Sequence, residues 1–331
     1  SANFAQGRAF LTASQSGVLV FGSGNAVQHR QLVWRDRAGR MLGVVGKPDD
    51  GDLPSVSLSP DERSILASRT VQGNQDVWVI DVGRGISTRL AFNDARDNAP
   101  VWSADGERVI FRSDRVGPYD LFQKSANGAG EEEKLLSSPD AKIPYHVSHD
   151  GQMLLYGVAN AKSGPDIWAL PLHDGGKPFA VVQSDFAEDA AQFSPDGRWV
   201  AYESNESGKF EIYIQAFPNA HGKWQVSVDG GTLPRWRPDG KELFYVSSTG
   251  ELMAARLSPA AGGVSFDIGA PVPLFTPRFA TGGAILSPGA LARPLYAVTR
   301  DGRFLINEAV ETAAGDTTVL TVVLNWDADL P

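Results

Sequence analysis

The sequence predicts an all-β protein built from repeated four-stranded units, and three observations lead to this fold class. A turn close to Ser-Pro-Asp-Gly, with apolar residues on both sides, recurs seven times along the 331 residues. A second, aromatic-rich run follows six of these turns at a similar distance. No segment shows the sustained 3.6-residue apolar period of an amphipathic helix. Units of about 40 to 45 residues, each forming one four-stranded antiparallel sheet, are typical of a β-propeller.

The recurring turn predicts a hairpin between the first two strands of each unit. Its Pro presets the backbone of the first central position, its Asp caps the turn and its Gly takes the left-handed conformation. The first positions of the turns are 43 to 46 residues apart, except for a last step of 62 residues. They are Ser14, Ser59, Ser103, Ser148, Ser194, Arg237 and Thr299. Glu62 stands at the Gly position of the second turn, so we expect a residue with positive φ or a different turn there.

The aromatic-rich run predicts the third strand of each unit. Its central residues lie 40 to 46 residues apart and are Trp34, Trp78, Phe122, Trp168, Tyr213 and Met253. A weaker fourth strand follows, for example at 86–92 and 223–228. Runs such as 77–81 and 242–246 are apolar on both faces, as expected of sheets packed between neighbouring blades. The regular spacing of the tryptophans indicates an inter-blade core more than a carbohydrate platform.

We expect one propeller domain over residues 1–331 with seven blades. The predicted blades start near residues 9, 54, 98, 143, 188, 232 and 294. Six blades is the alternative, because the first turn lacks Asp and the last unit ends at 318–326 without a clear fourth strand. We expect residues 1–8 to supply the missing fourth strand of the last blade and to close the ring, which removes free sheet edges.

The segment 276–293 is long for a connection between propeller strands. It predicts either a linker or a lid over the channel mouth. The apolar residues that would make the contacts of a lid are Ile285, Leu286 and Leu291.

Composition excludes several classes of protein. The formal charge is −9 and the basic residues do not cluster, which disfavours nucleic acid as a partner. No apolar run approaches 18 residues and the first residues do not resemble a signal peptide, so we expect any anchor or export signal outside these residues. The absence of Cys excludes disulfides and thiolate metal sites but leaves the compartment open.

Longer stretches carry a resemblance to a known family. They are QLVWRDRAGR (31–40), RDNAPVWSADG (96–106), QFSPDGRWVAYESNESGKFEIYIQAFP (192–218), GKWQVSVDGGTLPRWRPDGKELFYVS (222–247) and TVVLNWDADL (321–330). The repeats resemble the WD40-like repeats of TolB-type propellers. More closely, the stretches resemble the C-terminal propeller of large bacterial transmembrane serine/threonine kinases. That resemblance implies a preceding kinase domain and one membrane helix, with the propeller as an extracytoplasmic sensor. Three features depart from the family pattern: Glu62, an insertion near 280–293, and His149 in place of the turn Pro.

Catalytic motifs are not found in the sequence, so we expect a noncatalytic chain that needs no cofactor. The lysine, catalytic loop and metal-binding motif of kinases are missing, and so is a Gly-x-Ser-x-Gly elbow. GSGNAV (22–27) begins like a nucleotide loop, but no helix follows to receive phosphate. The enzymatic alternative is a metal-dependent propeller lyase or hydrolase. His146 and His149 form the sequence His-x-x-His, yet a strand points them to opposite faces, so we assign no metal ligand.

The predicted binding site lies at the channel mouth. Acidic segments precede the first strand of five units, at 49–54, 94–100, 140–144, 186–192 and 229–234, and propeller geometry places them on one face. Their carboxylates would attract a cation or a basic peptide, or would simply cap turns in solvent. The residues proposed from these segments are Asp52, Asp97, Glu188 and Asp189. His146, Gln192 and Arg235 occupy equivalent positions before an apolar anchor, where they reach the channel or pack between blades.

We therefore expect a recognition module whose ligand is a protein, a peptide or a small molecule. As a kinase sensor it would signal through ligand-induced repositioning or dimerisation, which requires different ligand affinities in the two states. A TolB-like scaffold that binds a partner's peptide in its channel is a further alternative. No contact of the chain itself with a membrane is expected.

Overall fold

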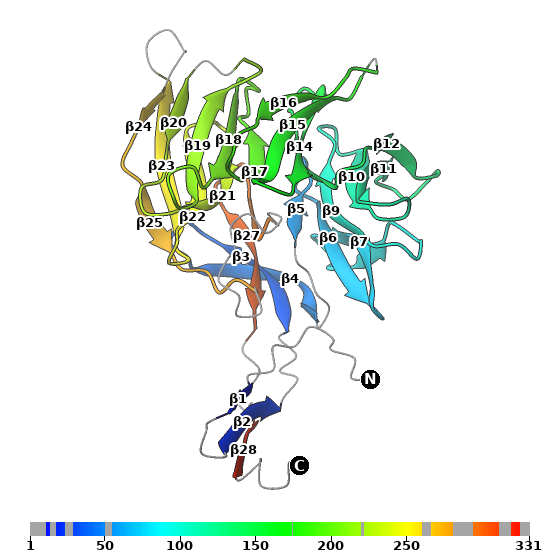
Figure 1. Ribbon diagram of the computed structural model, residues 1–331, viewed down its shortest axis with the longest axis vertical. Helices are drawn as coiled ribbons and strands as arrows, with labels where there is room; N and C mark the ends of the chain where they lie inside the picture. Colours follow the sequence, from blue (N-terminus) through cyan, green and yellow to red (C-terminus); the bar gives the residue numbers. More distant parts are fainter. Residues whose placement is uncertain are drawn as a thin grey trace. The chain divides into compact units, whose positions relative to one another are not determined.

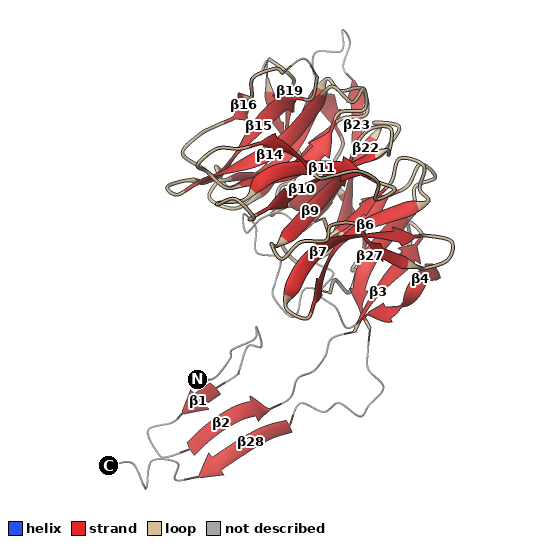
Figure 2. Ribbon diagram, turned by 90° about the vertical axis from the view of Figure 1, so that its right-hand side faces the viewer, coloured by secondary structure: helices blue, strands red, loops and turns tan. Residues whose placement is uncertain are grey.

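A computed structural model describes residues 11–13, 18–23, 29–49, 55–173, 175–219, 222–259, 266–280, 294–310 and 319–324. The chain divides into two compact units. The larger unit is Arg30–Ala309, and the smaller one combines Ser1–His29 with Val310–Pro331. The regular elements of the described residues are all β-strands, which confirms the all-β class (Figure 2).

The larger unit is a propeller of six blades, each an antiparallel sheet whose strands follow one another outward from the centre (Figure 1). Blade 1 contains β5 (Val56–Leu58), β6 (Ser64–Val71), β7 (Asn74–Asp81) and β8 (Ser87–Arg89). Blade 2 contains β9 (Asp97–Trp102), β10 (Arg108–Ser113), β11 (Asp120–Ser125) and β12 (Glu133–Leu136). Blade 3 contains β13 (Lys142–Val147), β14 (Met153–Asn160), β15 (Gly164–Pro171) and β16 (Phe179–Val182).

The other three blades repeat this order with two variations. Blade 4 contains β17 (Glu188–Phe193), β18 (Trp199–Ser204), β19 (Glu211–Ala216) and β20 (Lys223–Gln225). Blade 5 contains β21 (Thr232–Trp236), β22 (Glu242–Val246) and β23 (Leu252–Pro259), and both β24 (Phe266–Ile268) and β25 (Val272–Phe275) pair with β23. Blade 6 combines β26 (Tyr296–Val298) and β27 (Phe304–Ala309) with β3 (Arg30–Arg35) and β4 (Met41–Asp49).

Blade 6 closes the ring by joining the two ends of the larger unit. β27 pairs with β3 over six residues, from Phe304↔Arg35 to Ala309↔Arg30. We expected residues 1–8 to supply the closing strand. Those residues lie outside the described ranges, and β3 and β4 occupy the outer positions of the last blade instead.

The prediction of seven blades is wrong, and the alternative of six is confirmed. The blade expected near residue 9 does not form. Instead, β1 (Leu11–Ala13) pairs with β2 (Val18–Ser23), and β2 pairs with β28 (Val319–Leu324), in a three-stranded sheet of the smaller unit. The strands that flank the first predicted turn and the first aromatic run therefore belong to different sheets. Trp34 lies opposite Leu305 of blade 6, more than 250 residues away in sequence.

The repeated turns have the predicted geometry. In blade 1, Ser59 Oγ donates to Asp61 Oδ1 at 2.6 Å and accepts from the Ser64 N–H at 2.9 Å. Glu62 has a φ of 62°, as its place at the Gly position predicts. His149 does not change its turn: Gly151 has a φ of 73° and its N–H donates to the Ser148 carbonyl at 2.8 Å.

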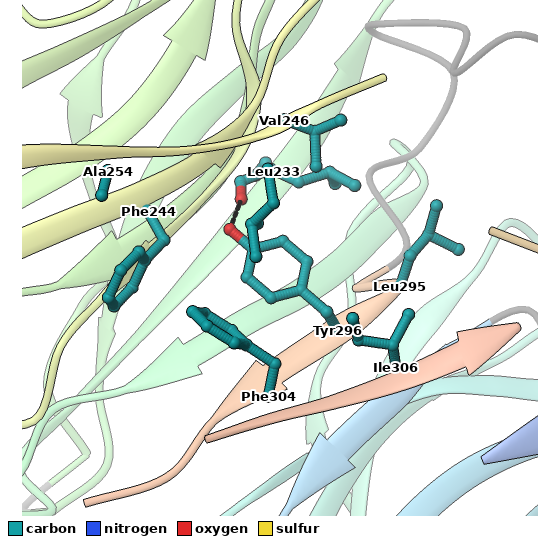
Figure 3. Close-up of a cluster of buried hydrophobic side chains, with 10 residues drawn as sticks. Leu233, Phe244, Val246, Ala254, Leu295, Tyr296, Phe304 and Ile306 are labelled. Atoms are coloured by element: carbon teal, nitrogen blue, oxygen red, sulfur yellow. Dashed lines mark hydrogen bonds between the residues drawn. The ribbon is translucent and has the colours of Figure 1, made fainter. Parts of the chain in front are cut away.

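The core lies mainly between blades. Trp102 of blade 2 packs with Leu66 and Val77 of blade 1, and Trp236 of blade 5 packs with Ile212 of blade 4, so these tryptophans belong to the inter-blade core. Figure 3 shows the cluster between blades 5 and 6, where the Tyr296 hydroxyl donates to the Leu233 carbonyl at 2.9 Å. The apolar faces of the sheets hold the ring together without helices in its described part.

Candidate functional site

The first strands of the six blades surround the propeller axis. Each contacts the next around the ring, in the order β5, β9, β13, β17, β21 and β26. Four of them, β9, β13, β17 and β21, contain a bulge near their middle. Ala99, Ala190 and Leu233 lie at three of these bulges with φ of 51° to 56°. A bulge redirects the side chains on either side of it.

Side chains of the second strands hold these bulges in place. The Ala99 N–H donates to Ser68 Oγ of blade 1 at 3.1 Å, and the Leu233 N–H donates to Glu203 Oε2 of blade 4 at 2.8 Å. The corresponding residue of blade 3 is Gly157, and the Tyr145 phenol fills its space. A Cβ on Gly157 would lie 2.1 Å from Tyr145 Oη.

Seven ionisable side chains from five blades form what we call the channel cluster. They are Arg112, Tyr145, His146, Asp189, Glu203, Arg235 and Tyr296. The Tyr145 hydroxyl donates to Asp189 Oδ1 at 2.5 Å, and burial together with the Asp189 charge raises the pKa of Tyr145 well above its usual value. Burial, reinforced by the Arg235 charge, lowers the pKa of His146 to about 3. The cluster therefore contains a neutral histidine and two neutral phenols at neutral pH.

Arg235 is the cation of this cluster with the fewest protein contacts. Its Nη1 donates to its neighbour, the Pro234 carbonyl, at 2.7 Å. Among the described residues no carboxylate lies within ion-pair distance of it, and its side chain is half-buried. Burial lowers the pKa of Arg235 from its usual value, and the nearby Tyr296 and Glu203 partly oppose this shift by raising the pKa. A guanidinium has five N–H donors, so most of its donor capacity is left for a ligand.

The predicted carboxylates of the mouth are buried. Asp97, Glu188 and Asp189 are 0%, 1% and 0% exposed, so these three do not form a solvated rim. Asp97 pairs with Arg115 at 3.1 Å and accepts from Asn93, and burial raises its pKa. Burial also raises the pKa of Glu188 to about 7, opposed by the Ser184 hydroxyl that donates to it at 2.5 Å.

Two of the three equivalent channel positions connect neighbouring blades. His146 Nδ1 accepts from the Phe193 N–H at 3.3 Å, and Gln192 Oε1 accepts from the Trp236 N–H at 2.8 Å. Arg235, at the third position, makes no such bond to the next blade among the hydrogen bonds of the described residues. Asp52 and the lid residues Ile285, Leu286 and Leu291 lie outside the described residues.

The structure thus brings His146, Asp189 and Arg235 into one cluster and places Asp97 and Glu188 between blades. The sequence analysis missed Arg112, Tyr145, Glu203 and Tyr296. Arg112 and Glu203 share a signal that was available: each is a charged residue six positions after the turn Gly, at the end of an apolar strand. In the strand register such a residue lies opposite the bulge of its own blade's first strand, and the Glu203 carboxylate bonds to the bulge of the next blade.

The described residues contain no group of three or more His, Cys, Asp or Glu side chains arranged to hold a metal. In the same part of the chain there is no helix with the length and apolar character of a membrane span.

Comparison with known proteins supports the fold class. No family model matches the sequence. An uncharacterised protein of Agrobacterium fabrum is 26% identical over 166 residues, which is 46% of this chain and 55% of that protein, so the match spans about half of the relative. A TolB candidate from Agrobacterium tumefaciens superposes with a TM-score of 0.63 at 16% identity, covering 86% of this chain and 99% of that one.

Two further structures are similar to this chain. TolB from Acinetobacter baumannii gives a TM-score of 0.57 at 16% identity over 75% of this chain and 65% of that one. An oligogalacturonate lyase in complex with manganese gives a TM-score of 0.53 at 13% identity, covering 96% of this chain and 82% of the lyase chain. The fold is therefore a TolB-like β-propeller. At these identities the likeness concerns the fold alone, and the function has to be argued from the site.

Proposed function

We propose that this propeller is a noncatalytic recognition module that binds a segment of a partner protein at its channel. The observation that carries the proposal is Arg235, a half-buried guanidinium in the channel cluster with one hydrogen bond to the protein. The TolB structures among its neighbours support a protein-binding propeller as the broader class.

The chemistry of Arg235 favours a carboxylate of the partner. Guanidinium and carboxylate pair through two parallel N–H···O bonds, and such a pair is stronger where water is scarce. Glu203, which lies near Arg235, accepts from the Leu233 N–H, and Asp189 of the same cluster accepts from the Tyr145 hydroxyl. We therefore propose an acidic side chain or a free C-terminus as the anchor. We keep Asp52 as a proposed residue of the channel mouth. We also keep Ile285, Leu286 and Leu291 as proposed residues of a lid over that mouth.

The test uses three sets of synthetic octapeptides, acidic, basic and uncharged, each with a free and an amidated C-terminus. We expect the acidic or free-carboxylate peptides to bind by calorimetry and to raise Tm, because they prefer the folded state. Arg235→Gln should weaken this binding at least tenfold. Arg198→Gln, a change at an exposed turn, is the matched control and should bind as the unmodified protein does. Equal binding by Arg235→Gln, or a preference for basic peptides, would refute the role of Arg235.

We further propose that the propeller is the extracytoplasmic sensor of a bacterial membrane serine/threonine kinase. The stretches at 31–40, 96–106 and 192–218 support this role by their resemblance to such sensors. The proposal requires a kinase domain and a single membrane helix ahead of the propeller in the same polypeptide. Reading the gene upstream of Ser1 tests it, and a different upstream domain would exclude the kinase link while leaving peptide binding untouched.

A further inference from the structure

Buried acids recur at one position of the ring, where the start of a third strand meets the start of the next blade's first strand. At the junction of blades 2 and 3 the two residues are Asp120 and Lys142, the first residues of β11 and β13. Lys142 Nζ donates to Asp120 Oδ1 at 2.9 Å and to the carbonyls of Ser138 and Asp140 at 3.1 and 2.7 Å. The positive charge of the Lys142 ammonium thus compensates the negative charge of the buried Asp120 carboxylate.

The neighbouring junctions also supply their own cations. Between blades 1 and 2, Asp76 pairs with Arg89 at 2.9 Å and Asp97 pairs with Arg115 at 3.1 Å. Between blades 4 and 5, Glu211 accepts from the Gly230 N–H at 2.9 Å and lies 3.4 Å from Lys209 Nζ.

The junction of blades 3 and 4 differs, because no Lys or Arg of the described residues pairs with its buried acids. Its two residues are both acids: Asp166 on β15 and Glu188, the first residue of β17, in the place of Lys142. They are 3% and 1% exposed. Among the described residues no Lys or Arg lies within ion-pair distance of either carboxylate, and the ammonium of nearby Lys223 is paired with Glu206.

Two oxygens of this junction have no donor. Asp166 Oδ1 and Glu188 Oε2 are buried without a hydrogen-bond partner in the described protein, and so is Ser163 Oγ. The other oxygen of each acid is held: Asn160 donates to Asp166 Oδ2 at 3.3 Å and Ser184 donates to Glu188 Oε1 at 2.5 Å. The two strands approach closely here, since a Cβ on Gly164 would lie 2.7 Å from the Ala187 side chain. Ionising both carboxylates in such a place is costly unless something compensates their charge.

We propose that this junction binds a divalent cation, Ca²⁺, through the carboxylates of Asp166 and Glu188. The cation would replace the ammonium that Lys142 supplies one blade earlier. Ser184 and Phe186 correspond in sequence to Ser138 and Asp140, so their carbonyls are the expected further ligands. The donors are all oxygen, which suits a hard cation, and the mixture of carboxylates, carbonyls and water suits the flexible coordination of Ca²⁺ better than the strict octahedron of Mg²⁺.

The test measures calorimetric binding and Tm of the chelator-treated protein at pH 8 with CaCl₂, MgCl₂ or MnCl₂. We expect Ca²⁺ to bind once and to raise Tm by a few degrees. Glu188→Lys, which copies the Asp120–Lys142 pair, should melt above the unmodified protein without metal and should lose the Ca²⁺ shift. Asp166→Asn and Glu188→Gln should both weaken Ca²⁺ binding at least tenfold.

Asp140→Asn is the matched control, because Asp140 lies exposed on the corresponding loop of the neighbouring junction. It should keep the full Ca²⁺ response. The absence of a Ca²⁺ response in the unmodified protein would overturn the proposal, and so would a response that survives in Glu188→Lys. Stabilisation by Glu188→Gln with no effect of metal would show that the two acids share a proton instead.

Discussion

His146 shows how the ring decides the charge of a single residue. Its Nδ1 is an acceptor for the Phe193 N–H, and burial beside Arg235 lowers its pKa to about 3. The imidazole is thus neutral in the folded protein over most of the acidic range, whereas an unfolded chain protonates it near its usual pKa of about 6.5.

This difference predicts an acid-dependent loss of stability. Above pH 6.5 the histidine is neutral in both states and contributes no pH dependence. Between pH 6.5 and about 3 only the unfolded state takes up the proton, so the free energy of unfolding falls as the pH falls. His146→Gln keeps an acceptor, as Gln192 does one blade later, and removes this loss. Relative to the unmodified protein it should gain roughly 3 kcal/mol between pH 7 and pH 4 in urea denaturation.

His149→Gln is the control for this experiment, since His149 is an exposed turn residue only three positions away. It should leave the pH dependence unchanged. If the two variants lose stability on acidification equally, the buried state of His146 is not the cause.

At the scale of elements, the hairpin turn is the most predictable part of the molecule. Ser194 Oγ donates to Asp196 at 2.6 Å and accepts from the Trp199 N–H at 3.0 Å, and the same pair of bonds recurs at Ser59, Ser103 and Ser148. The sequence reveals these turns because all their partners lie within five residues.

Ser194→Ala removes both bonds at a buried position. It should lower the free energy of unfolding by about 1–2 kcal/mol, because the Asp196 carboxylate and the Trp199 N–H each lose a partner. Urea denaturation monitored by Trp fluorescence measures this change. Ser207→Ala, at an exposed loop hydroxyl, provides the comparison and should cost far less. Equal effects would mean that the hydroxyl does not hold the turn.

The bulges and the channel cluster could not be predicted in the same way. Whether Ala99 or Leu233 adopts a positive φ depends on an acceptor from the preceding blade, Ser68 or Glu203. The sequence analysis found Arg235 by counting from the anchor residue, but it placed Asp97 and Glu188 at an open mouth. Those acids fill junctions between blades, and strand periodicity alone does not reveal which face of a bulged strand meets the neighbouring blade.

At the scale of the whole molecule, the number of blades depended on a single long-range pairing. The first aromatic run matches the others in sequence, but it completes blade 6 through β27 and not a blade of its own. A local repeat cannot show this, because β3 and β27 are separated by nearly the entire ring.

The closure predicts that the ring folds without the smaller unit. A fragment of residues 29–310 should unfold cooperatively with a Tm close to that of the full chain, since β3, β4, β26 and β27 are all present. A fragment of residues 50–310 lacks β3 and β4 and exposes the edge of β27, so it should aggregate or melt at lower temperature. Calorimetry and size-exclusion chromatography compare the two. A stable, monomeric shorter fragment would show that closure by β3 and β4 is dispensable.

The pairing of Arg30 with Ala309 also has a mechanical consequence. The chain enters and leaves the ring at two residues that face each other across a strand pair, and the Val310 N–H donates to the His29 carbonyl at 2.9 Å. A force that pulls these two points apart acts directly on the β3–β27 ladder. It breaks the hydrogen bonds of the ladder sequentially, starting at the Arg30–Ala309 end. The ring would then yield to tension at blade 6 first, while the other five blades stay folded until that seam has opened.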